Sequence, residues 1–234
     1  TAIKASFTLG RINWIGNFRD GFYAELYPAV SYNIASNFDP KVKPYSVSLC
    51  SNVKFFKAFK YIGINSRINI FAYLSNEKFG GDEIIDSMIR GIIDDRISPV
   101  SGVNQSRTSS AITLNLDFPI HLFTTDWENF LLTKKISFLK KLNFEVQLSP
   151  FIDLALIRTD TLIHNKDSKF KPEDGLYGAG LELLIFPLKW SSYVVRLSYG
   201  IDVGRVIFDK QIDKSWRNTS CRTSEFSIGL GTHF

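Results

Sequence analysis

The side chains that could bind a metal or carry out catalysis are few and widely separated in this sequence. The three histidines, His121, His164 and His233, do not have the spacing of zinc ligands. Serine, histidine and aspartate all occur, but they form no nucleophile-elbow pattern. The sequence therefore predicts a protein that is not an enzyme and that uses neither a metal nor a cofactor.

Two other features leave alternatives open. The acidic pairs at 82–83 and 94–95 could bind calcium in an external loop, although most such pairs are simply hydrated. Cys50 and Cys221 are far apart in the sequence, so they are either two free thiols or, in an oxidising compartment, a disulfide. On sequence alone both arrangements stay open.

Composition narrows the class of protein. The chain of 234 residues has a net charge of +5, but its lysines fall mainly in turns, as at 134–135 and 140–141. Nucleic-acid surfaces combine clustered basic side chains with stacking aromatic residues, which this chain does not interleave, so we expect no nucleic-acid partner. No apolar run approaches the roughly 20 residues of a membrane helix. The mean hydropathy of -0.02 is the value expected when apolar and polar residues alternate along strands.

Alternation with period two is the dominant pattern of the chain. From position 193 to position 203 every second residue is apolar, and Arg196, Ser198 and Gly200 stand between them. Such a segment is a strand with one apolar and one polar face. Glycine, serine and charge fill the polar face, which favours a transmembrane β-barrel whose apolar face meets lipid and whose polar face lines a lumen.

Nine segments show this alternation, so we expect an all-β fold in which residues 1–234 form one antiparallel outer-membrane β-barrel domain. The predicted strands are 2–15, 22–34, 45–56, 61–74, 111–122, 139–157, 176–187, 193–206 and 223–234. The connections alternate between short and long, which is typical of outer-membrane barrels and has no counterpart in a soluble β-sandwich. Asp117 and Asp153 fall on the polar faces of their strands.

Several short motifs in the second half of the chain occur in a recognisable order. They are MIRGI at 88–92, LDFPI at 116–120, PFID at 150–153, GAGLE at 178–182, FPL at 186–188, and FSIGLG at 226–231 before the final aromatic residue. In order and spacing they resemble the C-terminal half of the bacterial surface-antigen barrels. This superfamily includes BamA-like and TamA-like outer-membrane insertases and two-partner secretion pores. The resemblance covers about 87–234, and the first four strands add a compatible pattern.

The resemblance implies a site inside the lumen. The long connection at 75–109 would fold back into the barrel and carry the loop motif, Arg90 and Gly91. The arginine would meet acidic partners on the two following strands, Asp117 and Asp153. A guanidinium can donate to two carboxylates at once, and carboxylates in a confined lumen need a counter-charge.

The resemblance also implies a function without catalysis. The chain would lie in the bacterial outer membrane as the C-terminal part of a larger barrel and assist insertion, assembly or translocation of proteins. The first and last strands of such a barrel pair weakly, so an incoming strand can add to the open edge. The last strand carries the expected signal, which consists of Phe226, Gly229, Gly231 and Phe234.

The implied partners are outer-membrane lipid, unfolded outer-membrane or secreted proteins, and periplasmic modules or accessory subunits. Two alternatives belong to other classes. One is a passive small porin or adhesin barrel, and the other is a soluble β-sandwich that binds a ligand.

Overall fold

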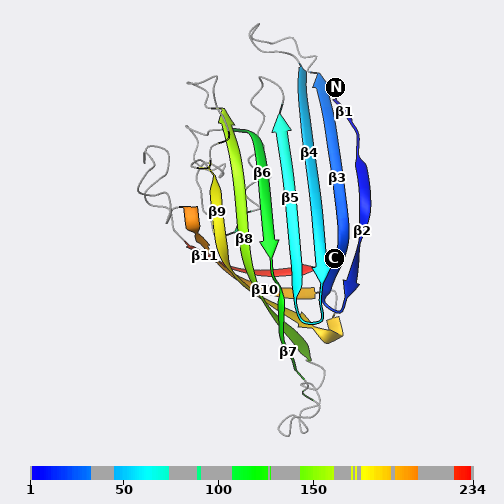
Figure 1. Cartoon of the computed structure of the whole chain (residues 1–234), viewed down its shortest axis with the longest axis vertical. Coiled ribbons are helices and arrows are strands. Elements are labelled where there is room, and N and C mark those ends of the chain that lie inside the picture. Colours follow the sequence, from blue (N-terminus) through cyan, green and yellow to red (C-terminus); the bar gives the residue numbers. More distant parts are fainter. Residues whose placement is uncertain are drawn as a thin grey trace.

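The structure of the protein is a computed structural model, which describes residues 2–32, 45–73, 89–90, 107–125, 127, 143–160, 170, 172, 175–190, 193–204 and 224–232. These residues form one antiparallel sheet of eleven strands with almost no helix (Figure 1). The strands are β1 (Ala2–Lys4), β2 (Phe7–Ile15), β3 (Phe18–Tyr32), β4 (Tyr45–Ala58), β5 (Gly63–Tyr73), β6 (Arg107–Asp117), β7 (Ile120–Thr124), β8 (Phe144–Asp160), β9 (Leu176–Pro187), β10 (Tyr193–Asp202) and β11 (Ser224–Thr232). The predicted all-β antiparallel fold is confirmed.

The sheet is a simple meander. Its order is β1-β3-β4-β5-β6-β8-β9-β10-β11, with β2 paired to β3 and β7 paired to β8. Within the described ranges β11 and the β1–β2 side remain the two edges, so the sheet does not close on itself. None of the helices in these ranges is long and apolar enough to cross a membrane.

Two prolines explain why eleven strands stand where nine were predicted. Lys4 pairs with Ala29 and Phe7 pairs with Leu26 in one unbroken register, so β1 and β2 are a single strand interrupted opposite Pro28. The carbonyl of Pro28 accepts a bond from the Ala5 N–H at 3.0 Å, but proline has no N–H for the return bond.

The second interruption, between β6 and β7, has the same cause. Pro150 on β8 lies opposite Phe118 and accepts a bond from its N–H at 3.0 Å, but it has no N–H for the return bond. Pro119 likewise accepts a bond from the Gly63 N–H at 2.7 Å and returns none. The pairing to β8 keeps one register from Asp117 opposite Phe151 to Ile120 opposite Leu148. The predicted segment 111–122 is therefore one strand divided opposite Pro150.

Several predicted boundaries were wrong. The strand predicted at 22–34 begins at Phe18, because Asp20 and Gly21 pair within the β2–β3 ladder instead of forming a turn. The turn itself is only Gly16 and Asn17, with φ of 60° at Gly16. The strand predicted at 139–157 runs from Phe144 to Asp160, the one predicted at 193–206 ends at Asp202, and β6 already begins at Arg107 inside the predicted loop.

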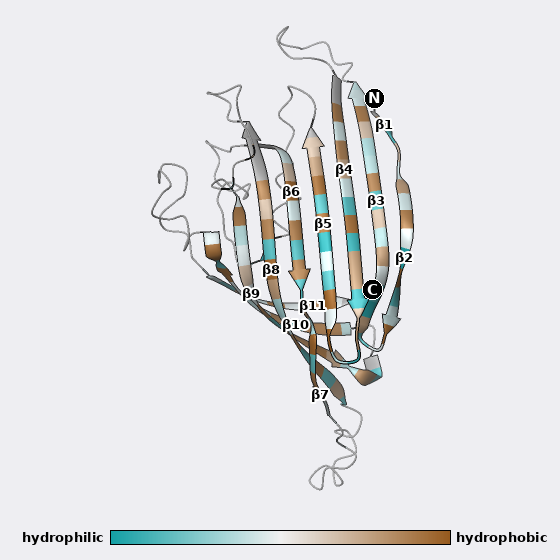
Figure 2. Cartoon of the chain, viewed as in Figure 1, coloured by the Kyte–Doolittle hydropathy of each residue, from teal (hydrophilic) through white to brown (hydrophobic). Residues whose placement is uncertain are grey.

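The two faces of the sheet differ in chemistry along its whole width. One side of the sheet is called the polar face here. It carries a row of residues that are partners across adjacent strands, namely Lys54, Arg67, Asn115, Asp153 and Gly178. The apolar face carries the neighbouring row Val53, Ile68, Leu114, Leu154 and Tyr177. Figure 2 shows the resulting alternation of hydrophobic and hydrophilic bands along the strands.

Burial distinguishes the same two faces. Asp153 on the polar face is 0% exposed and Glu182 is 5% exposed, whereas Leu181 and Ile228 on the apolar face are 50% and 68% exposed. The sheet curls around its polar side, because the Nδ2 of Asn17 in the β2–β3 turn donates to Oε2 of Glu145 on β8 at 2.6 Å. The predicted assignment of polar and apolar sides is thus confirmed for the described strands.

The β2–β3 hairpin depends on a glycine with an unusual backbone. Gly21 has φ of 132°, and a Cβ added there would collide with the carbonyl oxygen of Arg11. We expect Gly21→Ala to lower the free energy of unfolding by about 1–3 kcal/mol, because the strained backbone and the clash both act on the folded state. Chemical denaturation of the folded protein measures this loss.

Gly229→Ala is the matched control for this substitution. A Cβ at Gly229 meets nothing within 4 Å, and its φ is not positive. Its free energy of unfolding should change by less than about 0.5 kcal/mol. Equal losses for the two variants would contradict a specific requirement for glycine at position 21.

Candidate functional site

The described part of the long connection, Ile89 and Arg90, lies against the polar face. Ile89 is buried in a cluster with Ala111, Ala155 and Leu176. The backbone N–H of Arg90 donates to Oδ2 of Asp153 at 2.9 Å. These two contacts place Ile89 and Arg90 on the inner, curled side of the sheet.

Gly178 on β9 makes this close approach feasible. A Cβ at position 178 would collide with the carbonyl oxygen of Arg90. Gly178 is the register partner of Asp153, so the empty space lies beside the carboxylate that Arg90 binds. The first glycine of the GAGLE motif is thus required by packing, and the sequence alone did not show this requirement.

The side chain of Arg90 binds Asp153 through two nitrogens. Nε donates to Oδ2 and Nη2 donates to Oδ1, both at 2.8 Å. Together with the backbone bond, one fully buried carboxylate receives three N–H donors from a single residue. Forked arginine–carboxylate pairs of this kind are among the stronger hydrogen-bonded contacts in proteins.

Two further carboxylates surround the same guanidinium. Nη2 of Arg90 lies 2.7 Å from Oδ1 of Asp117 on β6, and Nη1 lies 3.6 Å from Oε2 of Glu182 on β9. Glu182 also lies 3.6 Å from Nη1 of Arg196 on β10. Arg90 therefore joins the connection to three strands by charge.

An aromatic ring completes the site. The guanidinium carbon of Arg90 lies 3.8 Å from the ring centroid of Phe151, within the range of a cation–π contact. A Cβ at Gly180 would lie only 2.7 Å from Cζ of Phe151, so the second glycine of GAGLE gives this ring its room. Phe151 and Gly180 are register partners on β8 and β9.

The electrostatics favour the charged arginine. Burial alone would lower the pKa of Arg90, but the hydrogen bonds that Arg90 donates to Asp153 and the charge of Asp117 outweigh it, so the pKa is raised above its usual value. We call Arg90 with its three carboxylate partners, Asp153, Asp117 and Glu182, the clamp, because a permanently charged guanidinium among carboxylates has a structural role. No pair of groups within it is arranged as nucleophile and base.

The sequence predictions for this site have different outcomes. The structure brings Arg90, Asp117 and Asp153 together, as the resemblance implied. Gly91 and Phe234 lie outside the described residues. Phe226, Gly229 and Gly231 lie on the edge strand β11, and Phe226 is exposed.

Glu182 and Phe151 were not predicted as partners of Arg90. Alternation along the segment 176–187 is consistent with Glu182 on the polar face, but only the folded sheet shows that it reaches the same guanidinium. A lone carboxylate between glycines and apolar residues was the available signal, because a charge in such surroundings needs a partner.

The other candidate groups are not assembled into a site. Within the described ranges no group of three or more histidine, cysteine or acidic side chains could hold a metal. Nδ1 of His121 lies 3.2 Å from Oε1 of Glu145, and Cys50 is a free thiol. Cys221, His164, His233 and the acidic pairs at 82–83 and 94–95 lie outside the described residues.

The clamp predicts non-additive effects of substitution. Arg90→Ala and Asp153→Asn should each lower stability by about 3 kcal/mol, because each leaves a buried charged or polar group without its partner. The double variant should lose far less than the sum of the two, since the second change removes a partner that is already lost. Heat-modifiable gel mobility or chemical denaturation measures the stability of the parent, the two single variants and the double variant in this double-mutant cycle.

Two further variants make this cycle specific. Arg90→Lys should fail to restore stability, because an ammonium group cannot fork across Asp153 and also reach Asp117. Lys57→Ala breaks an exposed pair with Asp20 at 3.2 Å and should cost less than about 1 kcal/mol. Additive losses at positions 90 and 153 would show that the two residues are not coupled.

The chain was also compared with known proteins. No family model, no curated protein and no solved structure matches it. The resemblance to surface-antigen barrels therefore remains a prediction from the sequence motifs.

Proposed function

We propose that this chain forms part of an outer-membrane β-barrel of the surface-antigen type, which assists the insertion, assembly or translocation of proteins at a weak seam. The observation that carries this proposal is the clamp. A connecting segment is folded onto the polar face of an alternating sheet and is held there by Arg90 with Asp153 and Asp117. The sequence motifs implied that same contact.

The apolar face supports a membrane location. Large apolar side chains on this face are exposed on all the long strands, and they include Phe22, Phe55, Ile68, Ile112, Ile152, Leu181, Tyr199 and Ile228. A continuous exposed patch of this kind is unusual on a soluble monomer, but lipid would solvate it. The described residues form a single sheet with no second sheet over this face, which argues against the soluble sandwich.

The clamp is the reason that we propose an insertase-type barrel ahead of a passive pore. Its three charged contacts hold residues 89–90 against the polar face. The clamp fills part of that face and ties three neighbouring strands to one connection. It supports a barrel with an occupied lumen and argues against an open channel.

The edge of the sheet supplies the proposed seam. β11 pairs only with β10 within the described ranges, and its outer backbone groups are available to another strand. Gly229 and Gly231 leave this strand with few side-chain contacts, which suits an edge that opens. Because nine register-continuous strands leave the sheet open, we propose that further strands complete the barrel.

Lipid exposure of the apolar face is directly testable. Leu197 pairs with Leu183 and Ile228 in an apolar row, so Leu197→Arg should lower the free energy of unfolding in a bilayer by about 2–4 kcal/mol. Leu197→Met is the matched control and should cost less than about 1.5 kcal/mol. Spin labels at 195 and 197 should report lipid, and a label at 196 should report water. Water at 195 and 197 would refute the proposed orientation.

Site-specific photo-crosslinking tests the proposed activity. With a photoreactive residue at Ser227 on β11, we expect crosslinks to an outer-membrane protein that is being assembled in the same cells, because its strand would add to this edge. The same residue at Ser66, on the central strand β5, should give none. Substrate crosslinks at neither position, together with open-channel conductance in planar bilayers, would favour a passive porin.

A further inference from the structure

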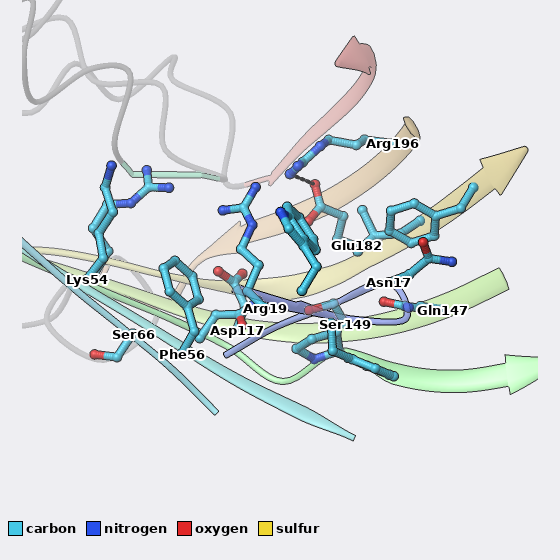
Figure 3. A pocket seen from close by; sticks show the side chains of 17 residues that line it. Asn17, Arg19, Lys54, Phe56, Ser66, Asp117, Gln147, Ser149, Glu182 and Arg196 are labelled. Atoms are coloured by element: carbon cyan, nitrogen blue, oxygen red, sulfur yellow. Dashed lines mark ion pairs between the residues drawn. The ribbon is translucent and has the colours of Figure 1, made fainter. Parts of the chain in front are cut away.

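A cavity of about 330 Å³ lies on the polar face, beside the clamp. It lies between the β2–β3 turn and β10, and Figure 3 shows the side chains that line it. Four basic residues contribute to its wall, and they are Arg19, Lys54, Arg67 and Arg196. Its volume is within the usual range of small-molecule sites.

Two of these basic residues are held directly opposite each other. Lys54 on β4 and Arg67 on β5 are register partners on the polar face. Like charges at opposed positions destabilise an antiparallel pair. Their repulsion destabilises the folded sheet. A negative group between these two residues and the remaining cations would offset it.

Aromatic rings hold two of the cations in place. The guanidinium carbon of Arg19 lies 5.0 Å from the ring of Trp14 and 5.3 Å from that of Phe56. Nζ of Lys54 lies 5.3 Å from the ring of Tyr23. Contacts with ring faces orient a cation without neutralising it, so the N–H groups stay available to an anion.

The carboxylates of the cavity are already engaged. Asp117 is paired with Arg90, and Glu182 lies between Arg90 and Arg196. In the part of the chain that the structure describes, no carboxylate forms an ion pair with Arg19, Lys54 or Arg67. Glu25, on the strand next to Lys54, receives the hydroxyl of Tyr23. Its charge attracts Lys54, and the charge of Asp117 attracts Arg19, but neither contact is a direct ion pair. The three cations of the basic half therefore have no direct ion-pair partner among the described residues.

We propose that this cavity binds a multivalent phosphate, such as a pyrophosphate or a phosphate monoester, through Arg19, Lys54 and Arg67. Guanidinium groups match the oxygens of a phosphate in forked pairs, and an ammonium adds a point charge. A doubly charged anion between the three cations converts their mutual repulsion into attraction. The site does not depend on the proposed function, because it rests only on the curled polar face.

Binding of inorganic pyrophosphate to the full-length chain, in the detergent or lipid in which it folds, is the primary test. Pyrophosphate should raise the midpoint of thermal unfolding and give a saturable isotherm in calorimetry, because a ligand that binds only the folded state stabilises it. Sodium chloride at the same ionic strength is the control for charge screening. An equal rise with chloride, or no rise with pyrophosphate, would overturn the proposal.

Substitutions in the cavity give a paired readout. Lys54→Gln and Arg67→Gln should weaken pyrophosphate binding about tenfold or more, because each removes a charge-assisted hydrogen bond. Both variants should also unfold at a higher temperature than the unliganded parent, because they relieve the repulsion between opposed cations. Retained affinity with a lower unfolding temperature would contradict the assigned site.

Lys57→Gln is the matched control for Lys54→Gln. Lys57 lies on the same strand, pairs with Asp20 and does not line the cavity. Its pyrophosphate affinity should stay within about twofold of the parent, since exposed pairs contribute little. A loss as large as that of Lys54→Gln would indicate a general effect of net charge and would reject a localised site.

Competition experiments identify the source of the phosphate. Short-chain phosphatidic acid should displace pyrophosphate if the natural ligand is a lipid headgroup, whereas short-chain phosphatidylcholine should not displace it. If neither lipid competes while pyrophosphate still binds, the ligand is a soluble phosphate. Binding of a poly-aspartate peptide without any binding of pyrophosphate would replace the proposal with an acidic polypeptide.

Discussion

A fully buried carboxylate is the constraint on which the inner side of this sheet depends. Asp153 is 0% exposed, and a buried charge without a partner is strongly unfavourable. Arg90 supplies that partner through three hydrogen bonds, two from the side chain and one from the backbone. The neighbouring sequence fits this need, because Gly178 leaves space for the Arg90 backbone and Phe151 lies against the guanidinium. A connection far from β8 in the sequence is thereby made part of the sheet's interior.

The two sides of the curled sheet are joined by a contact separate from the clamp. The strands that form these sides are interrupted opposite Pro28 and Pro150 without a shift of register. At the far side of the curl, the β2–β3 turn reaches Glu145 through Asn17. Oε1 of Glu145 also accepts from Gln147 at 2.8 Å and lies near His121, so one carboxylate anchors three elements. Asn17 and Gln147, which both bind this carboxylate, also line the cavity.

Alternation along single strands was sufficient to predict the class of fold, both faces and the placement of Asp117 and Asp153. It could not show that Glu182 joins them, because period two assigns a face and only the pairing register assigns neighbours. The interruptions were missed for a related reason. A proline is visible in the sequence, but which ladder bond it removes depends on its partner strand. The strand predicted to begin at 22 begins earlier, because an Asp-Gly pair is a common hairpin signal in sequence whereas Gly21 uses its positive φ inside the ladder.

The charges of the polar face are divided between its two halves. The strands β6, β8 and β9 carry Asp117, Asp153 and Glu182, while β3, β4 and β5 carry Arg19, Lys54 and Arg67. The halves do not neutralise each other directly in the shared row, because Asn115 stands between Arg67 and Asp153 and separates their backbones by about 10 Å, two strand spacings. The acidic half instead receives a cation from outside the sheet, in Arg90. In the basic half, Glu25 and Asp117 attract Lys54 and Arg19 without forming a direct ion pair, and a phosphate in the adjoining cavity would supply that direct partner.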